Sequence, residues 1–202
     1  SIGLVGSEMC IRDSNYSFDM NTSSIGSINF SSLRGVAYNG EFFALGETDN
    51  KNIYIWKGIP SLNDEPDYII QNPVGVGRID MNEEWLVVSA YPGAGSSVHV
   101  INLSNLDSGI MLPVPGNDDF PQGVSINEKG FFIALQGSNK VVGWSSVQDA
   151  LNGSPPTMSF GGTTNKTNSG TKMASTVHWD GFHLWVGEFK FSNRLLGFAP
   201  SK

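Results

Sequence analysis

Four stretches of the chain share one pattern of hydrophobic and polar positions. Each has a short alternating segment, a polar turn and a second apolar segment. These stretches are GVAYNGEFFALGE (35–47), GRIDMNEEWLVVSA (77–90), GVSINEKGFFIALQ (123–136) and TVHWDGFHLWVGE (176–188). Two of the turns contain Asn39-Gly40 and Asp180-Gly181, the sequence types most typical of a tight two-residue β-hairpin. The pattern therefore predicts four hairpins.

Each predicted hairpin is followed by further apolar segments. A third segment ends at Trp56, Ile101, Trp144 or Phe198, and these ends lie 45, 43 and 54 residues apart. A fourth follows a polar loop in three units, at residues 68–70, 110–112 and 157–160. The hairpins repeat with the same period, because Val36, Ile79, Val124 and Val177 are 43, 45 and 53 residues apart.

A repeat of about 45 residues with four antiparallel strands is typical of a β-propeller blade. We therefore expect an all-β chain that forms a partial β-propeller of four antiparallel four-stranded blades. The expected units span about residues 31–70, 75–114, 120–161 and 174–202. The alternative is a β-sandwich with four similar hairpins. No segment has the length and period of a long helix, and only residues 148–151 could form one turn.

Phrases in several units resemble NHL-type repeats of bacterial propellers. They are NIYIWKGIP (52–60) with DEPDYII (64–70), and NRLLGF (193–198). The resemblance extends over residues 25–202, is weakest in 77–115 and implies a six-bladed parent. WD40 repeats are the rival family, but their Gly-His and Trp-Asp pairs are missing from the expected places.

The first 14 residues do not fit this pattern. They include SEMCIRDS (7–14), which resembles a translated sequencing adapter. We therefore expect residues 1–14 to be an artefact and residues 15–202 to be an incomplete propeller, the alternative being a native terminus. Residues 25–30 are then expected to form the outermost strand of a preceding blade.

Composition narrows the range of partners. The chain has 12 basic and 19 acidic residues and a net charge of −7, which argues against nucleic acid as a partner. No apolar stretch approaches the roughly 20 residues of a membrane span. Cys10 is the only cysteine, so an internal disulfide is excluded. Abundant Ser, Thr, Asn and Gly suit an exported protein, so we expect an extracellular or periplasmic location.

Polar and aromatic residues after the second strands are the candidate ligand-binding residues. In a propeller these loops share one face with the connections between blades. The candidates are Glu47, Asp49, Tyr91, Gln136, Glu188 and Lys190. Glu47 and Glu188 occupy matched positions in their units, and the alternative is that both are structural hydrogen-bond acceptors.

His178 and His183 are weak candidates for a metal site. A two-residue turn at Asp180-Gly181 would place both imidazoles on one face of the hairpin. A metal would need a third ligand, and none is evident nearby in the sequence. We therefore expect no cofactor, although a divalent cation would be compatible with these residues, and we expect His99 to be structural.

These observations favour a non-catalytic module or scaffold that binds an unidentified protein, peptide or carbohydrate. The alternative comes from the resemblance, because similar propellers include metal-dependent hydrolases and lyases, such as lactonases, with a site at the channel mouth. A third alternative is a purely structural repeat.

Overall fold

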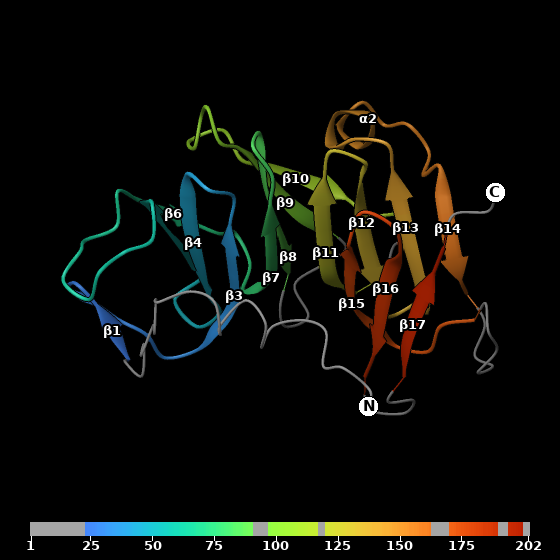
Figure 1. The fold of residues 1–202 in the computed structure, drawn as a ribbon, viewed down its shortest axis with the longest axis horizontal. Coiled ribbons are helices and arrows are strands. Elements are labelled where there is room, and N and C mark those ends of the chain that lie inside the picture. Colours follow the sequence, from blue (N-terminus) through green and yellow to red (C-terminus); the bar gives the residue numbers. More distant parts are fainter. Residues whose placement is uncertain (1–22, 91–96, 117–119, 163–169, 190–193, 200–202) are drawn as a thin grey trace, which may run out of the picture.

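The computed structural model describes residues 23–90, 97–116, 120–162, 170–189 and 194–199 (Figure 1). Nearly all of its regular structure is β-strand, and the strands form antiparallel sheets in sequence order. The expected fold class, a partial propeller built from antiparallel sheets, is confirmed.

Each sheet of three or four strands is one blade. Blade 1 consists of β3 (Leu33–Tyr38), β4 (Phe42–Glu47), β5 (Asn52–Lys57) and β6 (Tyr68–Gln71). Blade 2 consists of β7 (Val76–Met81), β8 (Trp85–Ala90), β9 (Ser97–Asn102) and β10 (Ile110–Pro113). Blade 3 consists of β11 (Pro121–Asn127), β12 (Gly130–Leu135), β13 (Lys140–Trp144) and β14 (Met158–Gly161). Blade 4 consists of β15 (Ala174–Trp179), β16 (Leu184–Glu188) and β17 (Leu195–Phe198).

The blades follow one another around an axis but do not close into a ring. The first strands lie side by side in the order β3, β7, β11, β15. They surround a hollow of about 390 Å³, the axial hollow, to which all four of these strands contribute residues. Figure 1 shows blade 1 at one side of the arc and blades 3 and 4 at the other.

The hydrophobic core lies between the blades. One cluster joins blades 1 and 2, a second joins blades 2 and 3, and a third joins blades 3 and 4. Side chains alternate along each strand, so every inner blade packs one face against the preceding blade and the other against the next. A single sheet cannot bury both of its faces alone, which explains why stacked repeats form one folded unit.

The hairpin turns of blades 1 and 4 differ from the expected two-residue type. In blade 1, Asn39 Oδ1 accepts hydrogen bonds from the backbone N–H groups of Glu41 (3.0 Å) and Phe42 (2.7 Å). In blade 4, Asp180 Oδ1 accepts from Phe182 and His183 in the same way. These Asx turns lengthen the loops.

The longer loop in blade 4 changes its register. His178 pairs with Trp185, so the predicted two-residue turn at Asp180-Gly181, which would have set His178 opposite His183, was wrong. The reason is that the Asp180 side chain accepts hydrogen bonds from the N–H groups of Phe182 and His183. In a tight two-residue turn these groups would be available for pairing between the strands.

The segment before blade 1 is a small hairpin rather than one outer strand. Ser24–Ile25 (β1) pairs with Ile28–Asn29 (β2), so the expected continuous strand at 25–30 was wrong. Gly26 has a φ of 56°, which suits the reversal and which other residues rarely adopt. Ser27 fixes the turn to a distant loop, because its N–H and its hydroxyl both donate to the carboxylate of Glu65.

A short helix lies in the loop of blade 3. This helix, α2 (Val147–Leu151), begins after Ser146, whose hydroxyl accepts a hydrogen bond from the Asp149 N–H. It lies where the sequence predicted a single turn.

Candidate functional site

Glu47 is the first of the predicted site residues. It ends β4 and is fully buried. Its Oε1 accepts hydrogen bonds from the N–H and the hydroxyl of Ser31, at 2.7 and 2.8 Å. Its Oε2 accepts from Asn50 and Tyr54. Burial alone would raise the pKa of Glu47, but these hydrogen bonds outweigh it and hold the pKa below its usual value.

Glu188 has a matching environment in blade 4. Its Oε1 accepts from the Lys172 N–H at 2.6 Å, as Glu47 accepts from Ser31. Arg194 adds a two-pronged ion pair, with Nε and Nη2 donating to the two carboxylate oxygens at 2.8 and 2.7 Å. This pairing raises the pKa of Arg194. The structure thus places both matched glutamates where they fix the chain that leads into their blades.

Of the remaining predicted residues, the structure describes Asp49, which follows β4 in blade 1, and Gln136, which follows β12 in blade 3. Asp49 is exposed, and its Oδ2 accepts a hydrogen bond from the Ser31 hydroxyl at 3.2 Å. Gln136 follows β12 and is half-buried, with its N–H donating to the Phe120 carbonyl. Tyr91 and Lys190 lie outside the described residues.

His178 and His183 are not directly opposite each other in the hairpin. His178 lies on β15 and lines the axial hollow, whereas His183 lies beyond the turn, 3.7 Å from Asp180 and against the Trp185 ring. His99 is buried, and its Nδ1 lies 2.6 Å from Asn72 Oδ1. Burial lowers the pKa of His99. Among the described residues, no three His, Cys, Asp or Glu side chains are placed to hold a metal ion together.

Asp80 is the acidic residue among those that line the axial hollow. Burial raises its pKa, although hydrogen bonds from the backbone N–H groups of Ile126 (2.9 Å) and Met81 (3.0 Å) act in the opposite direction. The bond to Ile126 crosses from blade 2 to blade 3. Because both oxygens of Asp80 accept backbone N–H groups, its first role is to hold two blades together.

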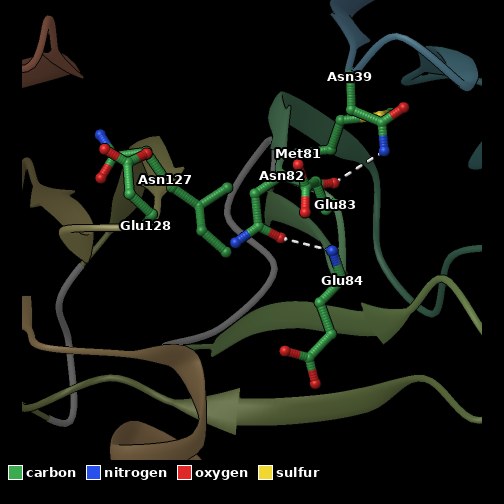
Figure 2. A pocket seen from close by; sticks show the side chains of 8 residues that line it. Asn39, Met81, Asn82, Glu83, Glu84, Asn127 and Glu128 are labelled. Atoms are coloured by element: carbon green, nitrogen blue, oxygen red, sulfur yellow. Dashed lines mark hydrogen bonds between the residues drawn. The ribbon is translucent and has the colours of Figure 1, made fainter.

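A larger hollow lies at the end of the first strands where the hairpin turns are, between the turns of blades 1, 2 and 3 (Figure 2). We call it the turn-side hollow, and its volume is about 720 Å³. Figure 2 shows Asn82 on one side of it and Asn127 with Glu128 on the other. Its lining residues are Asn39, Met81, Asn82, Glu83, Glu84, Ile126, Asn127 and Glu128.

The asparagines give the turn-side hollow a fixed frame. Asn39 Nδ2 donates to the Asn82 carbonyl at 2.8 Å and so joins the turns of blades 1 and 2. Asn82 Oδ1 accepts from the N–H groups of Glu84 and Trp85, and Asn127 Oδ1 accepts from that of Lys129. These side chains therefore form hydrogen bonds within and between the turns.

The glutamates of the turn-side hollow are differently placed. Glu83, Glu84 and Glu128 are exposed. Within the described part of the chain, no hydrogen bond or ion pair is found for their carboxylates, in contrast to Glu47 and Glu188. The turn-side hollow therefore offers negative charge to a partner.

Sequence reasoning missed this site, because its residues come from three turns far apart in the chain. The available signal was the recurrence of asparagine three residues after each of Val36, Ile79 and Val124.

Comparison with known proteins supports the architecture. No protein-family model and no curated protein sequence matches the chain. Among solved structures it is similar to the computationally designed protein Ika4, with a TM-score of 0.59 and 10% identity over 89% of this chain and 98% of that one. It is also similar to the β-propeller domain of Cps50 (Swd1) from Myceliophteria thermophila, with a TM-score of 0.58 and 10% identity over 81% of this chain. The fold is that of a β-propeller.

A third similar structure is a chain of the nidogen/laminin complex, with a TM-score of 0.59 and 12% identity over 85% of this chain. The chain spans 51% of the Cps50 propeller and 65% of the nidogen/laminin chain. At such identities these similarities concern the fold alone. In the described part of the chain, none of the helices has the length and apolar character needed to cross a membrane.

Proposed function

We propose that this propeller arc is a non-catalytic binding module whose turn-side hollow takes a basic segment of a partner protein. The observation that carries the proposal is the hollow of about 720 Å³ edged by the carboxylates of Glu83, Glu84 and Glu128. A rigid set of strands holds these turns around a shared concavity, which is the usual way in which a propeller presents a binding surface.

Charge supports a basic ligand. The chain has a net charge of −7, which favours encounter with a cationic partner. Lysine and arginine side chains are the natural partners of exposed carboxylates, and arginine can bind a carboxylate with two parallel hydrogen bonds. The partner would supply the donors that these glutamates do not receive from the described residues.

The test is binding of a hexa-arginine peptide, measured by isothermal titration calorimetry. The double variant Glu83→Gln/Glu128→Gln should weaken binding by about fivefold, since each exposed ion pair contributes up to about 1 kcal/mol. Raising the salt concentration should weaken binding further.

Asp49→Asn is the matched control, because it removes one negative charge from the opposite, loop-bearing face. We expect peptide affinity to stay within the small change caused by the lower net charge. If Asp49→Asn weakened binding as much as the double variant, attraction to the turn-side hollow would be refuted. If it weakened binding more, the predicted face around Asp49 and Gln136 would be the binding face.

We also propose a repeat family and a cellular location, which go beyond the fold. We assign the units to the NHL type on the phrases at 52–60, 64–70 and 193–198, and we place the protein outside the cytoplasm on its Ser-, Thr-, Asn- and Gly-rich composition. The metal-dependent hydrolase or lyase remains the alternative. Activity that requires a divalent cation, and that is lost in Glu188→Gln but retained in Glu128→Gln, would support it.

A further inference from the structure

Among the described residues, the first and last blades each leave one face without a neighbouring blade. We call the face toward the preceding blade the leading face and the face toward the next blade the trailing face. Ile79, Val124 and Val177 mark the leading faces of blades 2, 3 and 4, and each is at most 7% exposed. Val36, the matched residue of blade 1, is 60% exposed.

The interface between blades 3 and 4 shows what a trailing face binds. Phe132 of blade 3 stacks on Trp179 of blade 4, with ring centroids 6.0 Å apart and planes at 17°. The Ser125 hydroxyl of blade 3 accepts a hydrogen bond from the backbone N–H of Trp179 at 3.3 Å. The bond from the Ile126 N–H to Asp80 is its counterpart between blades 2 and 3.

The trailing face of blade 4 repeats these features. Trp185 takes the place of Phe132, and each ring lies against a glycine of the third strand, Gly197 in blade 4 and Gly143 in blade 3. His178 takes the place of Ser125 and Asp80. Leu195, on the same face, is 68% exposed.

The leading face of blade 1 offers the complementary features. Tyr38 occupies the position of Trp179, two residues after the matched valine, and is 47% exposed. By the pattern of the interface between blades 3 and 4, Trp185 would stack on Tyr38 and His178 would accept from the Tyr38 N–H. Aromatic pairs of this kind contribute beyond the area that they bury.

The hairpin β1–β2 completes the match. Ile25, Ile28 and Phe30 pack against Tyr54 and Trp56 on the leading face of blade 1. In the interface between blades 3 and 4, Phe160 of the fourth strand β14 packs in the same way against Phe198 of β17. The hairpin thus stands where a preceding blade would have its fourth strand, and blade 4 has three strands among the described residues.

We propose that a second copy of this chain docks head to tail, with blade 4 of each copy on blade 1 of the other. The β1–β2 hairpin of one copy then lies beside β17 of its partner, in the place of a fourth strand. Two such contacts close a ring of eight blades, a number within the usual range for propellers. The contact continues the geometry of the three blade interfaces already present within each copy.

The experiment is sedimentation equilibrium of the full chain across a wide range of concentrations. A reducing agent is present so that Cys10 cannot link copies. We expect a species of twice 21.8 kDa. Val36→Asp on the leading face and Leu195→Asp on the trailing face should each raise the dissociation constant at least about tenfold, because each would bury an unpaired charge.

Mixing the two variants tests the direction of docking. The Val36→Asp chain keeps its trailing face and the Leu195→Asp chain keeps its leading face, so the mixture should form a heterodimer through one intact contact. Ile110→Asp is the matched control, because Ile110 is 50% exposed on the outer strand of blade 2, away from both open faces. This control should leave the dimer unchanged, and circular dichroism checks that each variant is folded.

Three results would overturn the proposal. A monomer at every concentration would assign the open faces to blades of a longer polypeptide. Loss of the dimer in only one of the two face variants would indicate a face-to-face contact between like surfaces. A dimer unaffected by both would place the contact elsewhere. None of these results depends on whether the hexa-arginine peptide binds.

Discussion

Glu47 and Glu188 perform the same task in blades 1 and 4. Each accepts the N–H of a residue five positions before the matched valine of its blade, Ser31 in one case and Lys172 in the other. A carboxylate with several donors is well suited to hold a connecting segment, since charge-assisted hydrogen bonds are stronger than neutral ones. The two residues therefore fix the start of each blade to the end of its second strand.

Glu188→Gln should lower the free energy of unfolding by about 2 kcal/mol, because the amide cannot match the carboxylate toward the two donor nitrogens of Arg194. Urea unfolding followed by tryptophan fluorescence measures this change. Glu128→Gln, which changes an exposed and unpaired carboxylate, should stay within about 0.5 kcal/mol of the parent. Equal effects of the two substitutions would contradict the structural role of Glu188.

Glu47 should make stability depend on pH. Its pKa is lowered in the folded state, so the unfolded chain binds more protons as the pH falls through the usual glutamate range. The stability that Glu47 contributes is present above the unfolded pKa and is lost as the pH falls through the lower folded pKa. Glu47→Gln should therefore be less stable than the parent at neutral pH, and the difference should shrink on acidification. Urea titrations at several pH values test this, and a difference that grew toward low pH would refute it.

At the scale of single elements, the turns decide the register of each hairpin. The strands themselves were predictable, because alternation and a period of about 45 residues are visible in the sequence. The pairing in blade 4 was not, because it depends on the Asp180 side chain binding two backbone N–H groups. The β1–β2 hairpin was hidden for a similar reason, since Ser27 is held by Glu65, 38 residues away in the sequence.

Gly143, on the third strand of blade 3, lies against the ring of Phe132 on the second strand. A Cβ atom at this position would lie 2.7 Å from Phe132 Cδ1, and Phe132 is buried between two blades. Gly143→Ala should therefore lower the free energy of unfolding by about 1–3 kcal/mol.

Gly197→Ala is the matched comparison. Its Cβ would meet the Trp185 ring at 2.9 Å, but this ring lies on the open face of blade 4, so shifting it would disturb its hydrogen bond to Asp180 and not the packing between two blades. The cost should be below about 1 kcal/mol in the monomer. Denaturant titration of both variants at low protein concentration measures the difference, and a larger loss at Gly197 would reverse the interpretation.

In the described part of the chain, the middle blades of the arc have a neighbouring blade on both faces and the end blades have one on a single face. Blades 2 and 3 have hydrophobic clusters on both faces, whereas each end blade packs against only one neighbouring blade. Stability in a stacked repeat is approximately a sum over neighbouring interfaces. The ends should therefore open more readily than the middle.

Hydrogen–deuterium exchange should show this gradient. Amides of β8 and β12, in the middle blades, should exchange at least about tenfold more slowly than those of β16 and β17. Mass spectrometry of peptic fragments at low protein concentration measures the rates. Uniform protection across all four blades would mean that the end blades are supported by something other than their inner neighbours.

The candidate site was less predictable than the fold. The strands could be predicted because their hydrophobic pattern recurs in each blade. The turn-side hollow exists only when three turns meet, and none of Glu83, Glu84 or Glu128 is distinctive within its own unit. Conversely, Glu47 and Glu188 attract notice because they match, but their match reflects shared backbone geometry.

The hydrogen bonds from backbone N–H groups to Asp80 and Ser125 have an evolutionary consequence. A main-chain donor is present at every residue except proline, so the acceptor of one blade makes almost no demand on the sequence of the next. Genes for such proteins can gain or lose a repeat by duplication or deletion and still encode neighbours that fit. The donor position can hold different side chains, as Ile126 and Trp179 show, without losing the bond that joins the blades.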